Sequence, residues 1–309
     1  MKTLTLRGTD RPVSNIILGL MRIQNLSDEE VRALYSAARE VGIDFFDHAD
    51  IYGSPRHGCE QRFGDALQLS AAEREEIVLQ SKVGIRKGWF DFSKEHILTT
   101  VDEALAALRT DYLDILLLHR PDALVEPEEV AAAFDSLQES GKVRGFGVSN
   151  HTPGQIEVLK TAVTQPLLVN QVQLSIPHAP LIAQGVAANM ADLDQSISRD
   201  VGLLDYSRLN GITLQAWSPF QAGFFKGVFV GDREKFPELN DLLDQYAAKY
   251  GVTPSGIAVA WITRHPADIQ VVLGTTKPER VRESAAGSDV RLEREEWYAL
   301  FRAAGYKVP

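Results

Sequence analysis

The sequence predicts an α/β protein of the (β/α)8 class, a TIM barrel that residues 1–309 form as a single domain. Short runs rich in leucine and β-branched residues alternate with longer amphipathic stretches, as parallel strands alternate with their connecting helices. Eight such runs can be counted, and eight strands close this barrel. The turn after the first run, Met-Arg-Ile-Gln-Asn at 21–25, contains no glycine, which argues against a doubly wound fold.

The eight runs are almost continuously apolar, which is typical of strands buried on both faces of a sheet. They are Asn15–Leu20, Ile43–Asp47, Ile77–Lys82, Asp114–His119, Val143–Ser149, Leu168–Val172, Ile212–Trp217 and Ile269–Leu273. The fifth run contains Gly145-Phe146-Gly147, the nearest match to a dinucleotide fingerprint, but this segment lacks the third glycine.

Helical patterns with recognisable end signals lie between the runs. Ser27 and Glu30 form a capping box in front of one apolar periodicity, and a proline opens another at its first turn. The clearest predicted helices are Ser27–Val41, Ser93–Leu108, Pro127–Ser140 and Ser255–Arg264.

Two segments lie outside the alternation. Leu4–Arg7 and Pro12–Ser14 flank Gly8-Thr9-Asp10 and predict a short hairpin that closes the bottom of the barrel. Gln173–Ser198 is a long excursion between the sixth and seventh runs, and loops of that length are usually functional or mobile. It could close over the site or contribute to an oligomer contact.

Composition and charge exclude several classes of protein. The formal net charge of −10 argues against nucleic-acid binding, which needs clustered cations. No stretch approaches the roughly 20 apolar residues of a membrane helix. One cysteine, Cys59, and the lack of a secretory pattern favour a cytoplasmic protein. The sequence leaves the oligomeric state open.

Polar side chains stand where the predicted strands end, which in a TIM barrel is the active-site rim. Asp47 and Lys82 end neighbouring runs and are natural partners, because a buried charge needs a counter-charge. Tyr52 follows Asp47 by five residues, and His119 ends the fourth run. A lysine beside a tyrosine hydroxyl lowers the pKa of the phenol, which would make Tyr52 a general acid.

These residues sit in segments that resemble the aldo-keto reductase family in order and over nearly the whole chain. The matching segments are residues 47–53 (DHADIYG), Glu60 with 64–67 (GDAL), 111–114 (DYLD), 118–122 (LHRPD), 141–150 (GKVRGFGVSN), Asn170-Gln171, Trp217-Ser218-Pro219 and 274–280 (GTTKPER). Any one of these segments is a weak signal, but together they are specific for the family.

The resemblance implies NADP(H) as cofactor, a small carbonyl compound as substrate, and a catalytic tetrad of Asp47, Tyr52, Lys82 and His119. It implies that Ser149, Asn150 and Gln171 hold the nicotinamide carboxamide and that Trp217 stacks on its ring. Trp217 is a departure, since many members have tyrosine there. Other implied cofactor contacts are Gly19, Met21, Arg22, Asp47, Ser218, Pro219 and Phe220 near the nicotinamide, and Thr275, Thr276, Lys277, Arg280, Glu283 and Ser284 around the adenosine 2′-phosphate. Ser284 stands where asparagine is usual. Apart from the resemblance, the candidates for substrate contacts are Arg22, Trp89 and His119, and Met21, Phe90 and Phe220 are further candidates for the substrate pocket.

Each residue also has a purely structural interpretation. Asp47 and Lys82 could form only a buried ion pair, and Tyr52, His119 and Trp217 taken singly are ordinary packing residues. His48, Asp50, His57 and Cys59 are expected to be mainly structural or to line the substrate pocket.

Three other functions compete. A metal-dependent hydrolase would use His48, Asp50 and His119, but such sites need more converging ligands, and we expect no metal. A Schiff-base aldolase would use Lys82, but pairing with Asp47 favours a charged amine. A regulatory NADPH-binding module with little turnover is the third.

Overall fold

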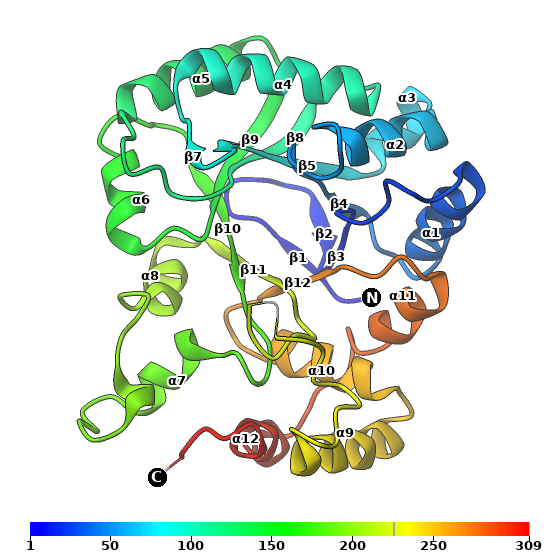
Figure 1. Ribbon diagram of the computed structural model, residues 1–309, viewed down its shortest axis with the longest axis vertical. Helices are drawn as coiled ribbons and strands as arrows, with labels where there is room; N and C mark the ends of the chain where they lie inside the picture. The colour runs from blue at the N-terminus through cyan, green and yellow to red at the C-terminus, as the bar shows by residue number, and fades with distance from the viewer. Residues whose placement is uncertain (225, 309) are drawn as a thin grey trace.

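The computed structural model describes residues 1–224 and 226–308, and its centre is a closed barrel of eight parallel strands (Figure 1). The barrel strands are β3 (Ile16–Gly19), β4 (Phe45–Asp47), β5 (Val78–Val83), β8 (Leu113–Leu118), β9 (Val143–Ser149), β10 (Leu167–Gln173), β11 (Thr213–Trp217) and β12 (Gln270–Leu273). Each pairs with the next along the chain, and β12 pairs with β3 to close the ring. The predicted TIM barrel is confirmed, with strand ends that differ by at most two residues from the sequence prediction.

Helices surround the barrel (Figure 1). They are α1 (Asp28–Glu40), α2 (Gly58–Leu67), α3 (Ala71–Glu75), α4 (Lys94–Leu108), α5 (Pro127–Glu139), α6 (Pro153–Leu159), α7 (Pro180–Val186), α8 (Leu203–Asn210), α9 (Pro237–Tyr250), α10 (Pro254–Thr263), α11 (Pro278–Ala285) and α12 (Arg294–Ala303). The capping box of Ser27 and Glu30 is present at α1. Helix α10 begins at Pro254 and not at Ser255, because Thr253 is its N-cap and proline takes the first helical position.

The N-terminal hairpin is also present, with a shifted first strand. β1 (Thr3–Thr5) pairs antiparallel with β2 (Pro12–Ser14), whereas Leu4–Arg7 was predicted. The strand ends early because Leu6 already belongs to the turn and its carbonyl accepts from Thr9 N at 3.0 Å. Leu6 and Val13 pack against side chains of the barrel interior, so the hairpin fills the end of the barrel at which the strands begin.

The excursion after β10 is more ordered than its length predicted. It contains α7 and a short 3-10 helix at Asp194–Ser196, and Pro180 opens α7 at its first turn. A two-stranded hairpin, β6 (Ile85–Arg86) and β7 (Trp89–Phe90), follows β5. Across residues 1–224 and 226–308, none of the helices combines the length and apolar character needed to cross a membrane.

Candidate active site

The four residues of the predicted tetrad meet at the end of the barrel where the strands finish. Asp47 ends β4, Lys82 lies near the end of β5, His119 directly follows β8, and Tyr52 lies in the loop after β4. Lys82 Nζ donates to Asp47 Oδ2 at 2.6 Å and to Tyr52 Oη at 3.3 Å. The ring centres of Tyr52 and His119 are 5.9 Å apart in an edge-to-face contact. The fold therefore brings together all four side chains.

Lys82 is a fully buried and fully satisfied ammonium group. Its third hydrogen bond goes to the carbonyl of His48 at 2.7 Å, so all three donors of the amine have acceptors. Burial lowers the pKa of Lys82, but Asp47 and Tyr52 together outweigh burial and the net shift is upward. The amine is therefore charged at neutral pH, which agrees with the argument against a Schiff-base aldolase.

The pKa of Tyr52 departs from the prediction. Burial of the phenol raises this pKa, Lys82 lowers it, and the net direction is upward from the ordinary value of 10.0. The prediction considered the lysine without its partner, and Asp47, bonded to the same amine, also raises the pKa of Tyr52. Tyr52 consequently holds its proton at neutral pH.

His119 is a neutral imidazole. Burial, together with the charges of Lys82 and Arg120, holds the pKa of His119 well below its usual range. Its Nδ1 atom is buried and has no hydrogen-bond partner among the described residues. A neutral ring next to Tyr52 can hydrogen-bond to an uncharged oxygen without adding a positive charge to the site.

The residues predicted to hold a nicotinamide form one connected chain beside the tetrad. Trp217 Nε1 donates to Asn150 Oδ1 at 3.1 Å, and Asn150 Nδ2 donates to Ser149 Oγ at 2.8 Å. Ser149 Oγ donates to the carbonyl of Gln171 at 2.8 Å, and Gln171 Nε2 donates to Asp47 Oδ1 at 3.0 Å. Asn150 adopts a positive φ of 60°, a conformation that asparagine tolerates better than most residues.

Sequence reasoning missed a layer of buried glutamines under the tetrad. Gln80 Nε2 donates to Asp47 Oδ1 at 2.6 Å and to Gln215 Oε1 at 2.9 Å. Gln215 in turn donates to Gln270 Oε1 at 3.1 Å, and Gln270 donates to the carbonyl of Ser14 at 2.9 Å. Gln80, Gln215 and Gln270 are each 0 % exposed. The layer separates the apolar barrel interior from the charged site and supplies Asp47 with a donor.

A second missed residue is Arg120, which follows His119 at the rim. Its guanidinium carbon lies 6.0 Å from the centre of the Trp217 ring. Burial lowers the pKa of Arg120, and Tyr52 opposes that shift. No hydrogen bond or ion pair of Arg120 occurs within residues 1–224 and 226–308. This half-buried cation is free to meet a ligand.

The loop after β3 lies beside the segment after β12. Arg22 Nη2 donates to the carbonyl of Gly274, and Met21 is 51 % exposed. A Cβ atom on Gly19 would lie 3.0 Å from the carbonyl oxygen of Leu273, so only glycine permits this close approach of β3 and β12. Gly19, Met21 and Arg22 are thus placed at one edge of the rim.

The predicted 2′-phosphate site lies at the start of α11. Arg280 and Lys277 are exposed, and their side chains have no hydrogen-bond or ion-pair partner in the described part of the chain. Thr275 Oγ1 accepts from Lys277 N at 3.1 Å, while Thr276 is half-buried and Glu283 exposed. Ser284 is only 2 % exposed, which leaves it little surface with which to contact an adenine.

The remaining predicted contacts lie around β11 and β7. Ser218, with a positive φ of 53°, and the buried Pro219 follow β11, and half-buried Phe220 comes next. Trp89 is 54 % exposed in the hairpin after β5, and its ring lies 4.9 Å from the Arg86 guanidinium carbon. Among the residues that the structure describes, no ring contact or hydrogen bond joins Trp89 to the tetrad, so its role as a substrate contact stays a prediction.

The other polar residues near Tyr52 are structural in this arrangement. His48 packs edge-to-face on Phe63, and Asp50 forms an ion pair with Arg56 at 2.6 Å. His57 bonds to Glu60, and Cys59 Sγ donates to the carbonyl of Met21. In the part of the chain that the structure describes, no three His, Cys, Asp or Glu side chains are grouped as metal ligands would be.

Comparisons with known proteins identify the family of the chain. Residues 15–303 match the model of the Aldo/keto reductase family. An uncharacterized oxidoreductase, YcsN of Bacillus subtilis, is 36 % identical over 97 % of this chain and 97 % of its own length. A 6-dehydroglucose reductase of Agrobacterium fabrum is 32 % identical, with 94 % of each chain covered.

Solved structures give the same answer. An aldo-keto reductase from Klebsiella pneumoniae, crystallised in complex with NADPH, is similar with a TM-score of 0.77 and 25 % identity. The match covers 100 % of this chain and 97 % of that one. The family match over most of the sequence, together with the barrel and the tetrad at its rim, leads to one conclusion: the chain belongs to the aldo/keto reductase family, whose relatives here are oxidoreductases.

Proposed function

We propose that this protein is an NADPH-dependent reductase that converts an aldehyde or ketone into an alcohol, with Tyr52 as the proton donor. The observation that carries the proposal is the contact of a protonated, half-buried tyrosine with a charged lysine, Tyr52 Oη to Lys82 Nζ at 3.3 Å. A carbonyl that gains a hydride at carbon must gain a proton at oxygen, and this phenol is placed to donate it.

The residues fit a nicotinamide cofactor, which would supply the hydride. Gln171 Oε1 accepts no hydrogen bond from the described residues and can accept from a carboxamide N–H. Ser149 Oγ has a second lone pair for the same purpose, and the Trp217 ring offers a stacking face. Arg280 and Lys277 at the start of α11 suit a phosphate, which favours NADPH over NADH.

Each member of the tetrad then has a distinct part. Tyr52 Oη gives its proton to the carbonyl oxygen, and Lys82 stabilises the tyrosinate that remains. Asp47 keeps Lys82 charged and in place through the 2.6 Å ion pair. The neutral His119 hydrogen-bonds to the carbonyl oxygen and orients it toward Tyr52.

The test is a comparison of the natural chain with Tyr52→Phe. NADPH binding, followed by quenching of tryptophan fluorescence, is expected to remain nearly unchanged, while reduction of a small-aldehyde panel is lost. Unchanged turnover in Tyr52→Phe would contradict the proton-donor assignment. Tight NADPH binding by the natural chain without turnover of any carbonyl would favour the regulatory alternative, and one relative, at 28 % identity, is a putative voltage-gated potassium channel subunit beta.

A further inference from the structure

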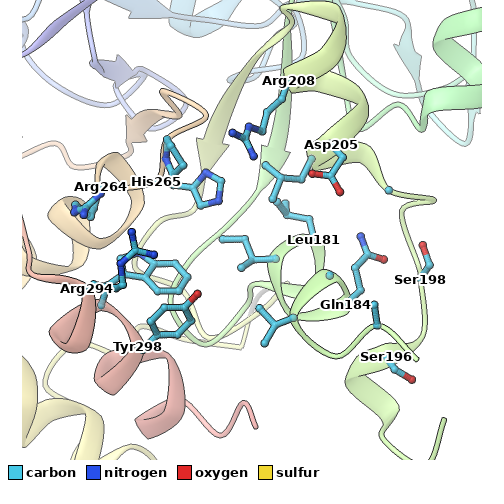
Figure 2. A pocket seen from close by; sticks show the side chains of 18 of the residues that line it. Leu181, Gln184, Ser196, Ser198, Asp205, Arg208, Arg264, His265, Arg294 and Tyr298 are labelled. Atoms are coloured by element: carbon cyan, nitrogen blue, oxygen red, sulfur yellow. The ribbon is translucent and has the colours of Figure 1, made fainter. Parts of the chain in front are cut away.

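A cavity of about 860 Å³ lies in the helical layer, between the excursion after β10, helices α8 and α12, and the segment that follows α10 (Figure 2). Its described walls include no member of the tetrad and none of the residues assigned above to a cofactor. The cavity is therefore separate from the candidate active site. It also gives the excursion a role other than covering the barrel, because α7 and the segment after it form one whole wall.

The walls of the cavity are strongly cationic. Four arginines line it, Arg208, Arg264, Arg291 and Arg294, against a single acidic residue, Asp205. The chain as a whole has 42 acidic and 32 basic residues, so this excess of positive charge runs against the overall composition. A local reversal of charge around a hollow attracts anions.

Most of these arginines lack a partner. Within residues 1–224 and 226–308, the side chains of Arg208, Arg291 and Arg294 donate no hydrogen bond and form no ion pair. Arg264 is different, because its Nε donates to the carbonyl of Leu292 at 2.7 Å. Figure 2 shows Arg208 extending from α8 and Arg294 from α12 toward the hollow between these helices. Their guanidinium groups are available to a carboxylate or a phosphate.

The rest of the wall is apolar. Leu181, Leu204 and Trp297 are buried residues that line the cavity. Trp297 stacks on Trp261 with ring centres 4.8 Å apart, and the indole N–H of each donates to the backbone carbonyl of the other. A fixed aromatic and aliphatic surface beside unpaired arginines suits a ligand that has both an anionic head and an apolar body.

Hydrogen bonds from the C-terminal segment hold the excursion in place. Tyr306 Oη accepts from Ala179 N at 2.7 Å and donates to the carbonyl of Pro177 at 3.1 Å. Gln195 and Lys307 exchange two hydrogen bonds of 2.8 and 2.9 Å. The cavity is thus preformed, which lowers the entropic cost of binding a ligand there.

His265 contributes a neutral donor to the same cavity. Burial and the charge of Arg208 lower the pKa of His265 to about 4, so the ring is uncharged at neutral pH. Its Nδ1 accepts from Ala267 N at 3.2 Å, which leaves the proton on Nε2.

We propose that this cavity is a second binding site that takes an organic anion, a carboxylate or phosphate head on an apolar body. Arg208 and Arg294 hold the head, and the body packs against Trp297, Leu181 and Leu204. The site is independent of the proposed reductase activity, since the walls and the tetrad share no residue.

The test is calorimetric titration of the full chain with octanoate and with octyl phosphate, with octanol and inorganic phosphate as probes of each half of the ligand. The tighter binder of the first two identifies the preferred head, and we expect octanol and inorganic phosphate to bind far more weakly. Arg208→Gln and Arg294→Gln should each weaken binding about tenfold, the loss expected for one charge-assisted hydrogen bond. Asp205→Asn should strengthen binding, because it removes the only carboxylate among the described residues of the walls.

Arg302→Gln is the matched control, since Arg302 is exposed on the same helix α12 but does not line the cavity. It should leave octanoate affinity unchanged, and all variants should keep the unfolding temperature of the natural chain. The proposal fails if neither amphiphile binds, if octanol binds as tightly, or if the arginine variants and Arg302→Gln bind alike. It also fails if a second copy of the chain covers this face. The exposed Leu209 would favour such a dimer. Sedimentation would then reveal the dimer, and Leu209→Ser would dissociate it.

Discussion

Replacement of Gln80 with methionine tests whether the glutamine layer positions the catalytic ion pair. Methionine keeps the length of the side chain and removes its polar atoms. The variant loses a hydrogen bond of 2.6 Å to the Asp47 carboxylate, where about 1.5–3 kcal/mol is typical, and two neutral bonds to Gln215 worth about 1 kcal/mol each. Every group left behind keeps another partner, since Gln171 also donates to Asp47 Oδ1 and Gln270 accepts from Gln215. The free energy of unfolding should therefore fall by about 4 kcal/mol, without loss of the fold.

The same change should lower kcat, because Asp47 orients Lys82 toward Tyr52 and the Lys82–Tyr52 contact of 3.3 Å is the longest that the amine makes. A loss of about 1.4 kcal/mol in transition-state stabilisation corresponds to about tenfold in kcat. Urea denaturation measures the stability, and steady-state reduction of a small aldehyde at saturating NADPH measures kcat.

Gln270→Met is the control, since it loses two neutral hydrogen bonds of the same layer, about 2 kcal/mol, but none to Asp47. An equal fall of kcat in both variants, or an unchanged kcat in Gln80→Met, would refute the positioning role.

Three further changes test other parts of the molecule. Arg280→Ala should weaken NADPH binding about tenfold with little effect on NADH binding, because a charge-assisted bond to the 2′-phosphate is lost. The control is Arg282→Ala on the same helix: Arg282 is paired with Glu40, and its loss should alter neither dissociation constant. Arg120→Gln should lower kcat/KM about tenfold for succinic semialdehyde and not for butanal, since this free cation faces the rim, and equal losses would mean a structural role. Burial lowers the pKa of His48 from 6.5 to about 4, so the unfolded chain takes up this proton at a higher pH than the folded one. The stability from neutral His48 is complete above pH 6.5 and is lost as pH falls toward 4, by about 2 kcal/mol at pH 5. The decline in unfolding free energy between pH 7 and pH 5 should be smaller by that amount in His48→Leu, and an unchanged decline would contradict the assignment.

The barrel could be predicted because its strands are buried on both faces and so appear as apolar runs. Strand ends were less predictable, as the hairpin illustrates. Leu6 continues the apolar pattern of β1, but its carbonyl is taken by Thr9 in the turn. Whether an apolar residue extends a strand or fills the end of the barrel depends on such backbone hydrogen bonds, which the sequence alone does not reveal. The sequence predicts a loop for the excursion after β10, since α7 has only one proline as an end signal and a short apolar stretch.

The tetrad could be predicted because polar residues at strand ends interrupt otherwise apolar runs. The same signal was available for Gln80, which lies two residues before Lys82 in β5 and therefore on the same face of the strand. Gln215 has the same relation to Trp217 in β11. These residues carry no charge, so the requirement that a buried charge has a counter-charge does not apply to them. The place of Arg120 in the site could not be predicted for a different reason, because a charged residue just past a strand usually faces solvent.

The direction of the Tyr52 pKa shift depends on a balance that residue types alone do not determine. Lys82 Nζ lies 2.6 Å from Asp47 Oδ2 and 3.3 Å from Tyr52 Oη. The Asp47 carboxylate therefore neutralises a large part of the lysine charge that acts on the phenol. Burial then decides the sign and keeps the proton on Tyr52. Once that proton leaves, the tyrosinate and Lys82 attract each other across the same 3.3 Å in a site screened from water. The lysine therefore contributes little to removing the proton from the resting tyrosine. It contributes much to stabilising the charge that forms on the tyrosine oxygen during proton transfer. Stabilisation at that stage raises the rate, because it acts on the transition state.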